Sequence, residues 1–219
     1  MSITEAAPLP LSAAFKQGSK ELHDQAEAAT FIDDLMNGKV NLAGYVNYLK
    51  SLRIVYAALE EVARDNASDP IVAVMHDPAL ERLASIEADI EALSTGAPEE
   101  SLCQHEAAQA YAAAIHAASG HAPRVIAHHY TRYLGDLSGG LAIGRILGRT
   151  FDLEDRGLAM YHFEDIKAKV YKDDYRERLD NLPFDDAQRA EAVTEVQAAF
   201  RHNQAVFAEL GKNLASYQR

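Results

Sequence analysis

Apolar residues recur along this chain at intervals of three and four positions, which is the repeat of an amphipathic helix. The clearest stripe consists of Leu42, Tyr45, Val46, Leu49, Leu52, Val55, Tyr56, Leu59 and Val62. Similar stripes occur over 80–93 and 193–210, and no segment alternates apolar and polar positions as a half-buried strand does. The pattern therefore predicts an all-α fold.

Prolines divide the chain into long segments that contain none. They stand at 8, 10, 70, 78, 98, 123 and 183, and helices usually begin or end near such positions. Together with the apolar stripes they predict helices over 11–28, 31–36, 42–64, 79–94, 102–118, 122–148, 153–161, 165–179 and 185–212. Turn clusters at 66–70 and 94–100 are too short to link domains. We expect a flexible N-terminus over 1–10 and a single all-α domain over 11–215.

Length and composition fit one globular domain with its own core, because 48% of the 219 residues are hydrophobic and 25% are charged. The net charge of -12 has the wrong sign for a general reader of the nucleic-acid backbone. Glu5 stands where a signal peptide carries Lys or Arg, and no apolar run is long enough to span a membrane. Cys103 has no second cysteine to pair with and is expected to be packed. We therefore expect a cytoplasmic protein without nucleic-acid partners or a membrane anchor.

Five glycines fall within the 14 residues of 135–148, inside a predicted helix. At about 1 kcal/mol each relative to alanine, they would weaken a helix by roughly 4–5 kcal/mol, so another interaction must offset this cost. Gly135 and Gly139 lie one turn apart, as do Gly140, Gly144 and Gly148, and their missing side chains leave a groove. The groove can admit a neighbouring helix or a flat ligand. Asp136 beside it is either a solvated carboxylate or a group that orients water at a reacting centre.

A second unusual pattern lies near the N-terminus, where Lys16, Lys20, His23 and Glu27 share one helical face. The two cations could hold an anionic cofactor. His23 could bind a metal through one ring nitrogen, while Glu27 accepts a hydrogen bond from the other. The alternative is an ordinary solvated face. Lys169, Lys172 and Arg176 form another basic face late in the chain, with the same two interpretations.

Motifs for a protein-only metal cage are absent from the sequence. None of the nine histidines follows a Glu-x-x pattern, and the chain has no His-Glu-x-x-His, Cys-x-x-Cys, phosphate loop or Gly-x-Ser-x-Gly. One protein ligand is enough for iron only when a porphyrin supplies the other four. His128 and His129 adjoin the glycine segment, but neighbouring histidines face different sides of a helix. We expect one of them packed and one exposed, and neither in a site.

Residues 130–140, Tyr-Thr-Arg-Tyr-Leu-Gly-Asp-Leu-Ser-Gly-Gly, resemble the distal-helix signature of heme oxygenases. Further matches follow in family order at 16–27, 56–61, 172–176 and 200–207, so the resemblance covers residues 15–210. The chain is nearest in length to small bacterial members that lack a C-terminal membrane tail. Leu141 departs from the pattern, because a glutamine commonly follows the paired glycines.

The resemblance implies that heme lies between a proximal helix and a distal helix of the all-α domain. His23 would be the axial iron ligand. Gly135, Gly139 and Gly140 would let the distal backbone lie against the porphyrin. Lys20, Glu27 and Ser138 would complete the heme-binding pocket.

The same resemblance assigns roles on the distal side and at the pocket edge. Asp136 would order water that supplies protons to the reacting oxygen, within a network that includes Tyr56 and Arg132. Phe200, Asn203 and Phe207 match the wall that supports this network. The positions that hold the heme propionates, and so favour attack at the α-meso carbon, match Lys16, Tyr130, Lys172 and Arg176.

These assignments imply a heme oxygenase that converts heme, O2 and electrons into biliverdin, Fe2+ and CO. Heme b would be both substrate and cofactor, with no other metal, and electrons would come from a ferredoxin or flavoprotein-reductase type of donor. We expect a monomer that serves iron acquisition or pigment synthesis. Two alternatives remain open, namely a heme carrier or sensor without turnover and an all-α pocket for a ligand other than heme.

Overall fold

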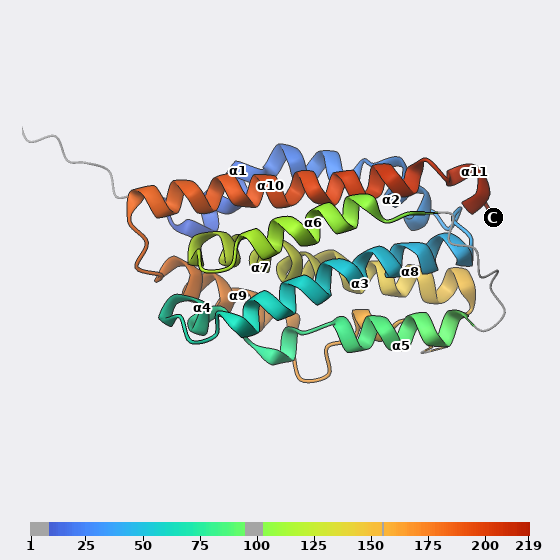
Figure 1. Ribbon diagram of the computed structural model, residues 1–219. Helices are drawn as coiled ribbons and strands as arrows, with labels where there is room; N and C mark the ends of the chain where they lie inside the picture. Colours follow the sequence, from blue (N-terminus) through green and yellow to red (C-terminus); the bar gives the residue numbers. More distant parts are fainter. Residues whose placement is uncertain (1–8, 95–102, 155) are drawn as a thin grey trace, which may run out of the picture.

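The computed structural model describes residues 9–94, 103–154 and 156–219, and it folds them into a bundle of helices (Figure 1). Strands do not form within these ranges, where the only β-type pairing is an isolated bridge between Val40 and Gln218. The all-α prediction is confirmed. None of the described helices combines the length and apolar character that crossing a bilayer requires.

The helices follow one another with short connections. They are α1 (Leu11–Glu27), α2 (Thr30–Met36), α3 (Leu42–Asp65), α4 (Pro70–Met75), α5 (Leu83–Ser94), α6 (Glu106–Ala117), α7 (Ala122–Gly135), α8 (Leu141–Phe151), α9 (Ala168–Asp180), α10 (Asp186–Gly211) and α11 (Leu214–Tyr217). Two 3₁₀ turns, η1 (Pro78–Leu80) and η3 (Ala159–Tyr161), and one π-helical turn, η2 (Asp136–Gly140), complete the described structure.

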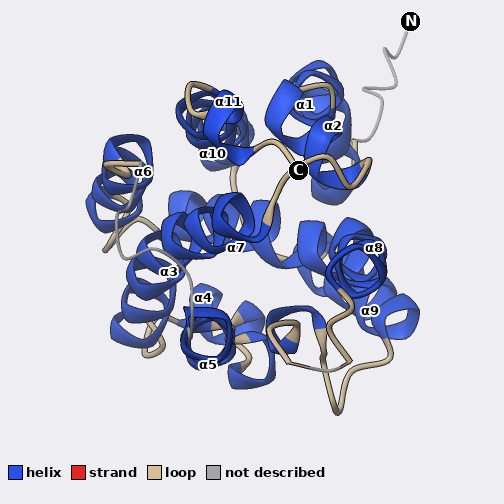
Figure 2. Cartoon of the chain, turned by 90° about the vertical axis from the view of Figure 1, so that its right-hand side faces the viewer, coloured by secondary structure: helices blue, strands red, loops and turns tan. Residues whose placement is uncertain are grey.

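The long helices surround α7. In the end-on view of Figure 2, α7 lies in the middle, with α1 and α10 on one side and α3 and α5 on the other. The most extensive contacts join α10 to α1 and α7, and α3 to α5 and α6. Buried residues form one continuous hydrophobic cluster from Leu11 to Tyr217, and Cys103 is packed within it as expected. The flexible tail predicted for 1–10 lies outside the described residues over 1–8, and the domain assignment stays a prediction.

The apolar stripes define the buried faces. Leu49, Leu52 and Leu59 of α3 are at most 3% exposed, and burying each leucine contributes about 1.5–3 kcal/mol relative to leaving it in water. The side chain of Asn41 accepts a hydrogen bond from the Gly44 amide at 3.0 Å and caps the start of α3. A capping box formed by Asp185 and Gln188 starts α10 in the same way.

One predicted helix, 79–94, is broken in the structure. The chain forms η1, becomes extended at Glu81 and begins α5 only at Leu83. The cause is the carboxylate of Glu60 on α3, which accepts hydrogen bonds from the amides of Arg82 at 2.6 Å and Leu83 at 2.7 Å. A tertiary cap therefore sets where α5 begins, and apolar spacing carries no sign of it.

The helix predicted over 153–161 is also wrong. Asp152 adopts a left-handed conformation (φ 53°) that ends α8, and Gly157 has φ 80°. Within the described part of 153–161, the one helical turn is η3 at 159–161. Its first amides, those of Ala159 and Met160, donate to the carboxylate of Asp89 on α5, both at 2.8 Å. As with α5, a buried carboxylate from another helix sets the local structure.

Smaller differences lie at other helix ends. The helix predicted from 102 begins at Glu106, because His105 is left-handed (φ 59°) and Glu209 on α10 accepts from the first amides of α6. Residue 102 itself lies outside the described residues. The short helices α4 and α11 were not predicted, although Asp69 caps α4 ahead of Pro70. The helix predicted over 122–148 continues to Phe151 as α7, η2 and α8.

Candidate active site

A pocket of about 520 Å³ opens between α1 and the α7–η2 segment, with α10 closing one side. Most of the predicted site residues meet there, although they are distant in sequence. The pocket is lined by Lys16, Lys20, His23, Glu27, Tyr130, Arg132, Gly135, Asp136, Ser138, Gly139, Gly140, Arg176, Phe200, Asn203 and Phe207. Of the predicted residues, Tyr56 and Lys172 are the two that do not line it. The N-terminal stripe and the glycine segment therefore face a common cavity.

His23 reaches this pocket from α1 with its side chain 51% exposed. Its Nε2 lies 3.6 Å from Oε1 of Glu27 and its Nδ1 lies 3.8 Å from Oδ1 of Asp24, both longer than a hydrogen bond. The ring edge contacts Phe200 of α10, with centroids 5.8 Å apart. The imidazole thus stands close to two carboxylates and against an aromatic ring, with about half of its side chain exposed at the pocket.

Contacts with α10 hold α1 in the orientation that presents His23. A Cβ at Gly18 would lie 2.8 Å from a methyl carbon of Val193, so the two helices pack closely there. Gln197 donates to the Gly18 carbonyl at 2.9 Å and Gln204 donates to the Leu22 carbonyl at 2.8 Å. Two side-chain amides of α10 therefore fix the helix face that carries His23.

Four of the five glycines differ in what surrounds them: two face open space where a ligand could lie, and two pack closely against a neighbouring segment. Space is open where a Cβ would stand at Gly135 or Gly139, and both positions line the pocket. A Cβ at Gly144 would instead lie 2.8 Å from the Cβ of Tyr161, and one at Gly148 would lie 3.1 Å from Leu158. The first pair leaves room for a ligand, and the second pair lets the η3 segment pack against α8.

Between α7 and α8 the backbone widens into the π-helical turn η2, which begins at Asp136. Such turns insert an extra residue into a helix and are frequent at functional sites. Here the turn exposes Ser138 and Gly139 on the pocket side while Asp136 stays buried. Two of its five residues, Gly139 and Gly140, are glycines and need no side-chain space.

Behind the pocket wall lies a buried network of polar side chains. Tyr56 donates a hydrogen bond to Oδ2 of Asp136 and receives two from Arg132, at 3.0 and 3.2 Å. Arg132 also donates to Oδ1 of Asn203 at 2.8 Å and lies 3.6 Å from Oδ1 of Asp136. Burial raises the pKa of Asp136, while Arg132 and the hydroxyl of Tyr56 oppose that rise. The network holds the carboxylate of Asp136 at the cavity.

Comparisons with known proteins show to which protein family this chain belongs. Residues 9–209 match the family model described as "Heme oxygenase". The chain is 34% identical to heme oxygenase 1 of Synechocystis sp. over 93% of its own length and 86% of that protein, and 35% identical to heme oxygenase 1 of Homo sapiens over 94% and 73%. The chain belongs to the heme oxygenase family.

Solved structures agree with this assignment. The crystal structure of heme oxygenase-1 from Synechocystis sp. in complex with heme is similar with a TM-score of 0.84 at 32% identity, covering 95% of each chain. A heme oxygenase from Leptospira interrogans also gives a TM-score of 0.84, at 29% identity, over 92% of this chain and all of that one. The heme oxygenase fold expected from the sequence is confirmed.

Two basic residues that the resemblance assigns to the propionates occupy the edge of this heme oxygenase pocket in different ways. Arg176 lines it, with Nη1 3.1 Å from Oδ1 of Asp173. Lys172 stands beside the pocket and donates to Oγ of Ser138 at 3.1 Å. On α1, the hydrogen bond between Lys20 and Asp24, 2.9 Å long, raises the pKa of Lys20. Lys169 is 92% exposed and does not line the pocket, so the solvated interpretation holds for that one residue.

Sequence reasoning missed part of the lining. Met160 and Tyr161 of η3 close one wall, and Ser19, Asp24, Ala26, Ile32, Tyr48, Thr131, Leu134 and Ile143 also line the pocket. The one available signal was the spacing of Gly140, Gly144 and Gly148, which requires a close neighbour without indicating which segment supplies it. The expectation that one of His128 and His129 is exposed is wrong, because they are 0% and 2% exposed.

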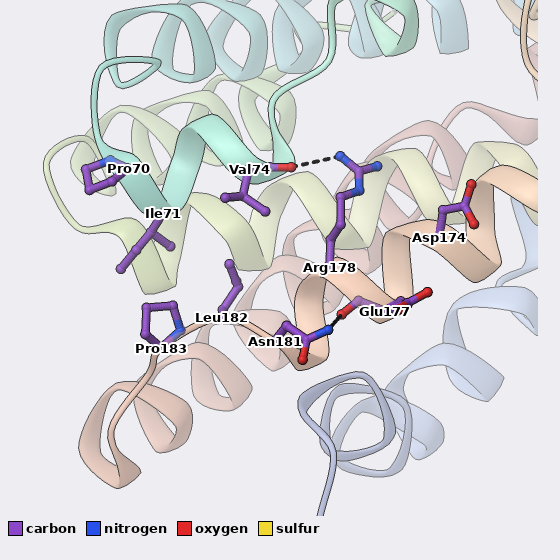
Figure 3. A pocket seen from close by; sticks show the side chains of 9 residues that line it. All are labelled: Pro70, Ile71, Val74, Asp174, Glu177, Arg178, Asn181, Leu182 and Pro183. Carbon is purple, nitrogen blue, oxygen red and sulfur yellow. Dashed lines mark hydrogen bonds between the residues drawn. The ribbon is translucent and has the colours of Figure 1, made fainter.

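A second hollow of about 690 Å³ lies elsewhere, between α4 and the end of α9 (Figure 3). Ile71, Val74 and Leu182 give it an apolar lining, and Asp174 and Glu177 stand on the α9 side. None of the predicted site residues borders it. The larger cavity is therefore not where the residues of the family signature gather.

Proposed function

We propose that this chain carries out the heme oxygenase reaction in the pocket between α1 and η2, opening heme at the α-meso carbon to give biliverdin, Fe2+ and CO. The observation that carries the proposal is the open space at Gly135 and Gly139, in one cavity with His23 and Asp136. A flat ligand can approach that backbone, and a ligand for its iron stands in the same cavity.

The lining fits heme by its chemistry. Leu134, Ile143 and Phe207 supply apolar contacts for a porphyrin, whereas Lys16 and Arg176 supply charge for its carboxylates. Both cations lie in a chain whose net charge is -12, so their placement at one cavity favours an anionic ligand there. Heme b meets both requirements, since it is largely apolar and has two propionates.

On the proximal side, we assign His23 as the iron ligand. Glu27 and Asp24 lie close enough to a ring nitrogen to orient the imidazole after a small side-chain rotation. Phe200 limits that rotation, because its ring meets the imidazole edge. His23 therefore has an axial ligand's accessibility and a partner for its second nitrogen.

At the pocket edge, Lys16, Tyr130, Lys172 and Arg176 would hold the propionates, with Lys20 beside them. Lys172 lies on α9 and bonds to Ser138, so it ties the edge to η2. Contacts to two carboxylates on one side of the ring fix its rotation in the plane. We propose that this rotation places the α-meso carbon nearest Asp136.

On the distal side, bound heme supplies the iron that binds O2 and the ring that is oxidised. Asp136 orders water in the cavity and passes protons to the reacting oxygen, for which its raised pKa suits it. Arg132 and Tyr56 hold both carboxylate oxygens in place, and Asn203 in turn fixes Arg132. These residues position a proton donor before heme arrives.

The reaction also requires partners that the chain does not itself contain. We propose O2 as co-substrate, an electron donor of the ferredoxin or flavoprotein-reductase type, a monomeric enzyme and no metal besides heme iron. The cytoplasmic location expected from the sequence stays a prediction. The alternative of a carrier or sensor differs in outcome, because such a protein would return heme intact.

A titration followed by reduction tests the proposal. Purified protein is titrated with hemin, then given ascorbate under air and finally an iron chelator, while the optical spectrum is recorded. The expected result is a one-to-one complex with a Soret band that decays into the broad red absorption of biliverdin. A complex that releases unchanged heme with ascorbate and with a ferredoxin–reductase pair would contradict turnover, and no complex would contradict the site.

A further inference from the structure

Aromatic rings lead from the pocket to two tyrosines of α9. Tyr130 lines the pocket, and its ring centroid lies 6.4 Å from that of Tyr175. Tyr171 stands one turn before Tyr175 on the same helix. The guanidinium carbon of Arg178 lies over both rings, 5.5 Å from the centroid of Tyr171 and 5.6 Å from that of Tyr175. These contacts link the four side chains from the pocket to Tyr171.

A second series of rings joins the buried network to the same tyrosine. Tyr56, which is bonded to Asp136, lies 6.0 Å from Tyr133 between ring centroids. Tyr133 lies 4.6 Å from His129, and His129 stacks on Tyr175 at 5.8 Å with an interplanar angle of 10°. Two separate paths from the cavity therefore converge on Tyr175.

Three of these tyrosines have a proton acceptor at the hydroxyl. Tyr56 donates to Asp136, Tyr171 donates to Oδ2 of Asp77 at 2.7 Å, and the hydroxyl of Tyr175 lies 2.9 Å from Nδ1 of His129. An oxidised phenol is a strong acid, so tyrosine gives up an electron readily only when a neighbouring group accepts its proton. Tyr56 and Tyr171 meet that requirement at the two ends of the series, and Tyr175 meets it where the two paths join.

Other buried tyrosines lack this arrangement. Among the described residues, the hydroxyls of Tyr111 and Tyr217 are buried and make no hydrogen bond. Neither ring contacts the series described above, since Tyr111 stacks on His202 and Tyr217 meets Phe31. An acceptor at the hydroxyl thus distinguishes Tyr56, Tyr171 and Tyr175 from Tyr111 and Tyr217. Tyr45, outside the series, donates to the Gly157 carbonyl at 2.7 Å, which cannot take up a proton as a carboxylate or an imidazole can.

The outer end of the series is accessible. Tyr171 is partly exposed, and Arg178, which covers it, forms a wall of the hollow in Figure 3, where it donates to the Val74 carbonyl at 2.8 Å. Tyr175 is fully buried. A small reductant in solution can therefore reach Tyr171 but not the rings behind it.

We propose that this series of rings carries oxidising equivalents from an over-oxidised heme to the surface. When peroxide oxidises the bound heme without ring opening, one electron passes from Tyr175 to the heme, through Tyr130 or through His129, Tyr133 and Tyr56, while the Tyr175 hydroxyl proton moves to Nδ1 of His129. Tyr171 then gives one electron to Tyr175, which recovers its proton from His129, and the proton of the Tyr171 hydroxyl moves to the carboxylate of Asp77. Ascorbate or a thiol supplies one electron to Tyr171, which recovers its proton from Asp77, and the oxidised reductant releases its own proton to water. The inference rests on the proposed function, because it requires a porphyrin in the pocket.

Zinc protoporphyrin allows a test that does not depend on turnover. The complex is excited by a light flash in the presence of a cobalt(III) ammine, which removes one electron and leaves a porphyrin radical cation. Its decay is followed optically, and a tyrosyl radical is sought by electron paramagnetic resonance. The expected result is a cation that decays into a tyrosyl radical, and a radical that ascorbate removes.

Matched tyrosine-to-phenylalanine variants locate the path. Tyr175→Phe should lengthen the cation lifetime several-fold and abolish most of the tyrosyl signal, whereas Tyr217→Phe, another buried position, should behave as native. Tyr171→Phe, at a partly exposed position that tolerates the change, should leave a tyrosyl radical that ascorbate no longer removes quickly.

The outcomes separate this inference from the proposed function. A porphyrin that binds, with native decay and native radical yield in both Tyr175→Phe and Tyr171→Phe, would overturn the conducting role alone. Failure of zinc protoporphyrin to bind would overturn the placement of the substrate and the inference together. Loss of signal in Tyr217→Phe as well would show that the radical forms without a defined path, which also contradicts the proposal.

Discussion

The ring of Tyr161 packs directly on Gly144, where an added Cβ would lie 2.8 Å from the Cβ of Tyr161 and 3.0 Å from its ring. The contact joins η3 to α8 and holds the pocket wall formed by Met160 and Tyr161. Five residues earlier along the segment, at Gly139, a Cβ would meet open space in the cavity. Glycines of one motif therefore serve packing at one position and ligand access at another.

Alanine substitutions separate these two roles. Gly144→Ala places a methyl carbon against the Cβ and ring of Tyr161. Overpacking of this kind lowers the free energy of unfolding by roughly 1–3 kcal/mol. Gly139→Ala meets no protein atom, so its free energy of unfolding should be native or higher, since alanine favours helix by about 1 kcal/mol. Its hemin affinity should fall, because the methyl group enters the heme space. Urea unfolding and hemin titration of both variants check this prediction.

Each glycine variant serves as the control for the other. A Gly139→Ala protein that binds hemin as tightly as native would contradict the placement of the porphyrin against η2. A Gly144→Ala protein as stable as native would show that η3 moves freely, and would contradict its role as a fixed wall.

Replacing His23 tests the proximal assignment. His23→Ala removes the iron ligand and leaves the apolar lining and the basic edge, so hemin should still bind but with a shifted Soret band. Added imidazole should restore the native spectrum by occupying the vacated space. His116→Ala, at an exposed position of α6 that does not line the pocket, is the matched control and should be spectrally native. An unchanged spectrum in His23→Ala would show that another residue binds the iron.

Acid stability should depend on His129. Burial lowers the pKa of this imidazole to about 3, below the value of about 6.5 in an unfolded chain. Because the folded state disfavours the charged form, the stabilising contribution is complete above the unfolded pKa and is lost as the pH falls from about 6.5 toward about 3. His129→Gln, which cannot titrate, should flatten that loss. Urea midpoints at several pH values in this window check it, and equal pH slopes in both proteins would contradict it.

Apolar periodicity predicted the positions of helices such as α3 and α10, whose buried faces it defines. It did not predict helix ends that are set by a carboxylate from a distant part of the chain. Glu60 sets the start of α5, and Asp89 organises the η3 turn, through hydrogen bonds from backbone amides. Such contacts join residues far apart in sequence, and their strength depends on burial that only the folded chain provides.

The sequence predicted the two facing helices of the site but not the wall that closes the pocket beside them. A specific motif indicated Asp136 and the glycines, and helical spacing placed His23 on one face with Lys16. The wall supplied by Met160 and Tyr161 had no such signal, because it comes from a segment predicted as helix. One of His128 and His129 was expected to be exposed, but both are buried, since α7 lies at the centre of the bundle.

The most direct test of the central claim is single turnover by Asp136→Ala. This change removes the proton-donating carboxylate while leaving His23, the glycines and the basic edge in place. With hemin, ascorbate and a chelator, native protein should yield biliverdin of the α isomer. The variant should bind hemin with comparable affinity and produce little or none of it, a rate loss of about 100-fold or more for a general acid. Native yield and isomer in Asp136→Ala would contradict the account.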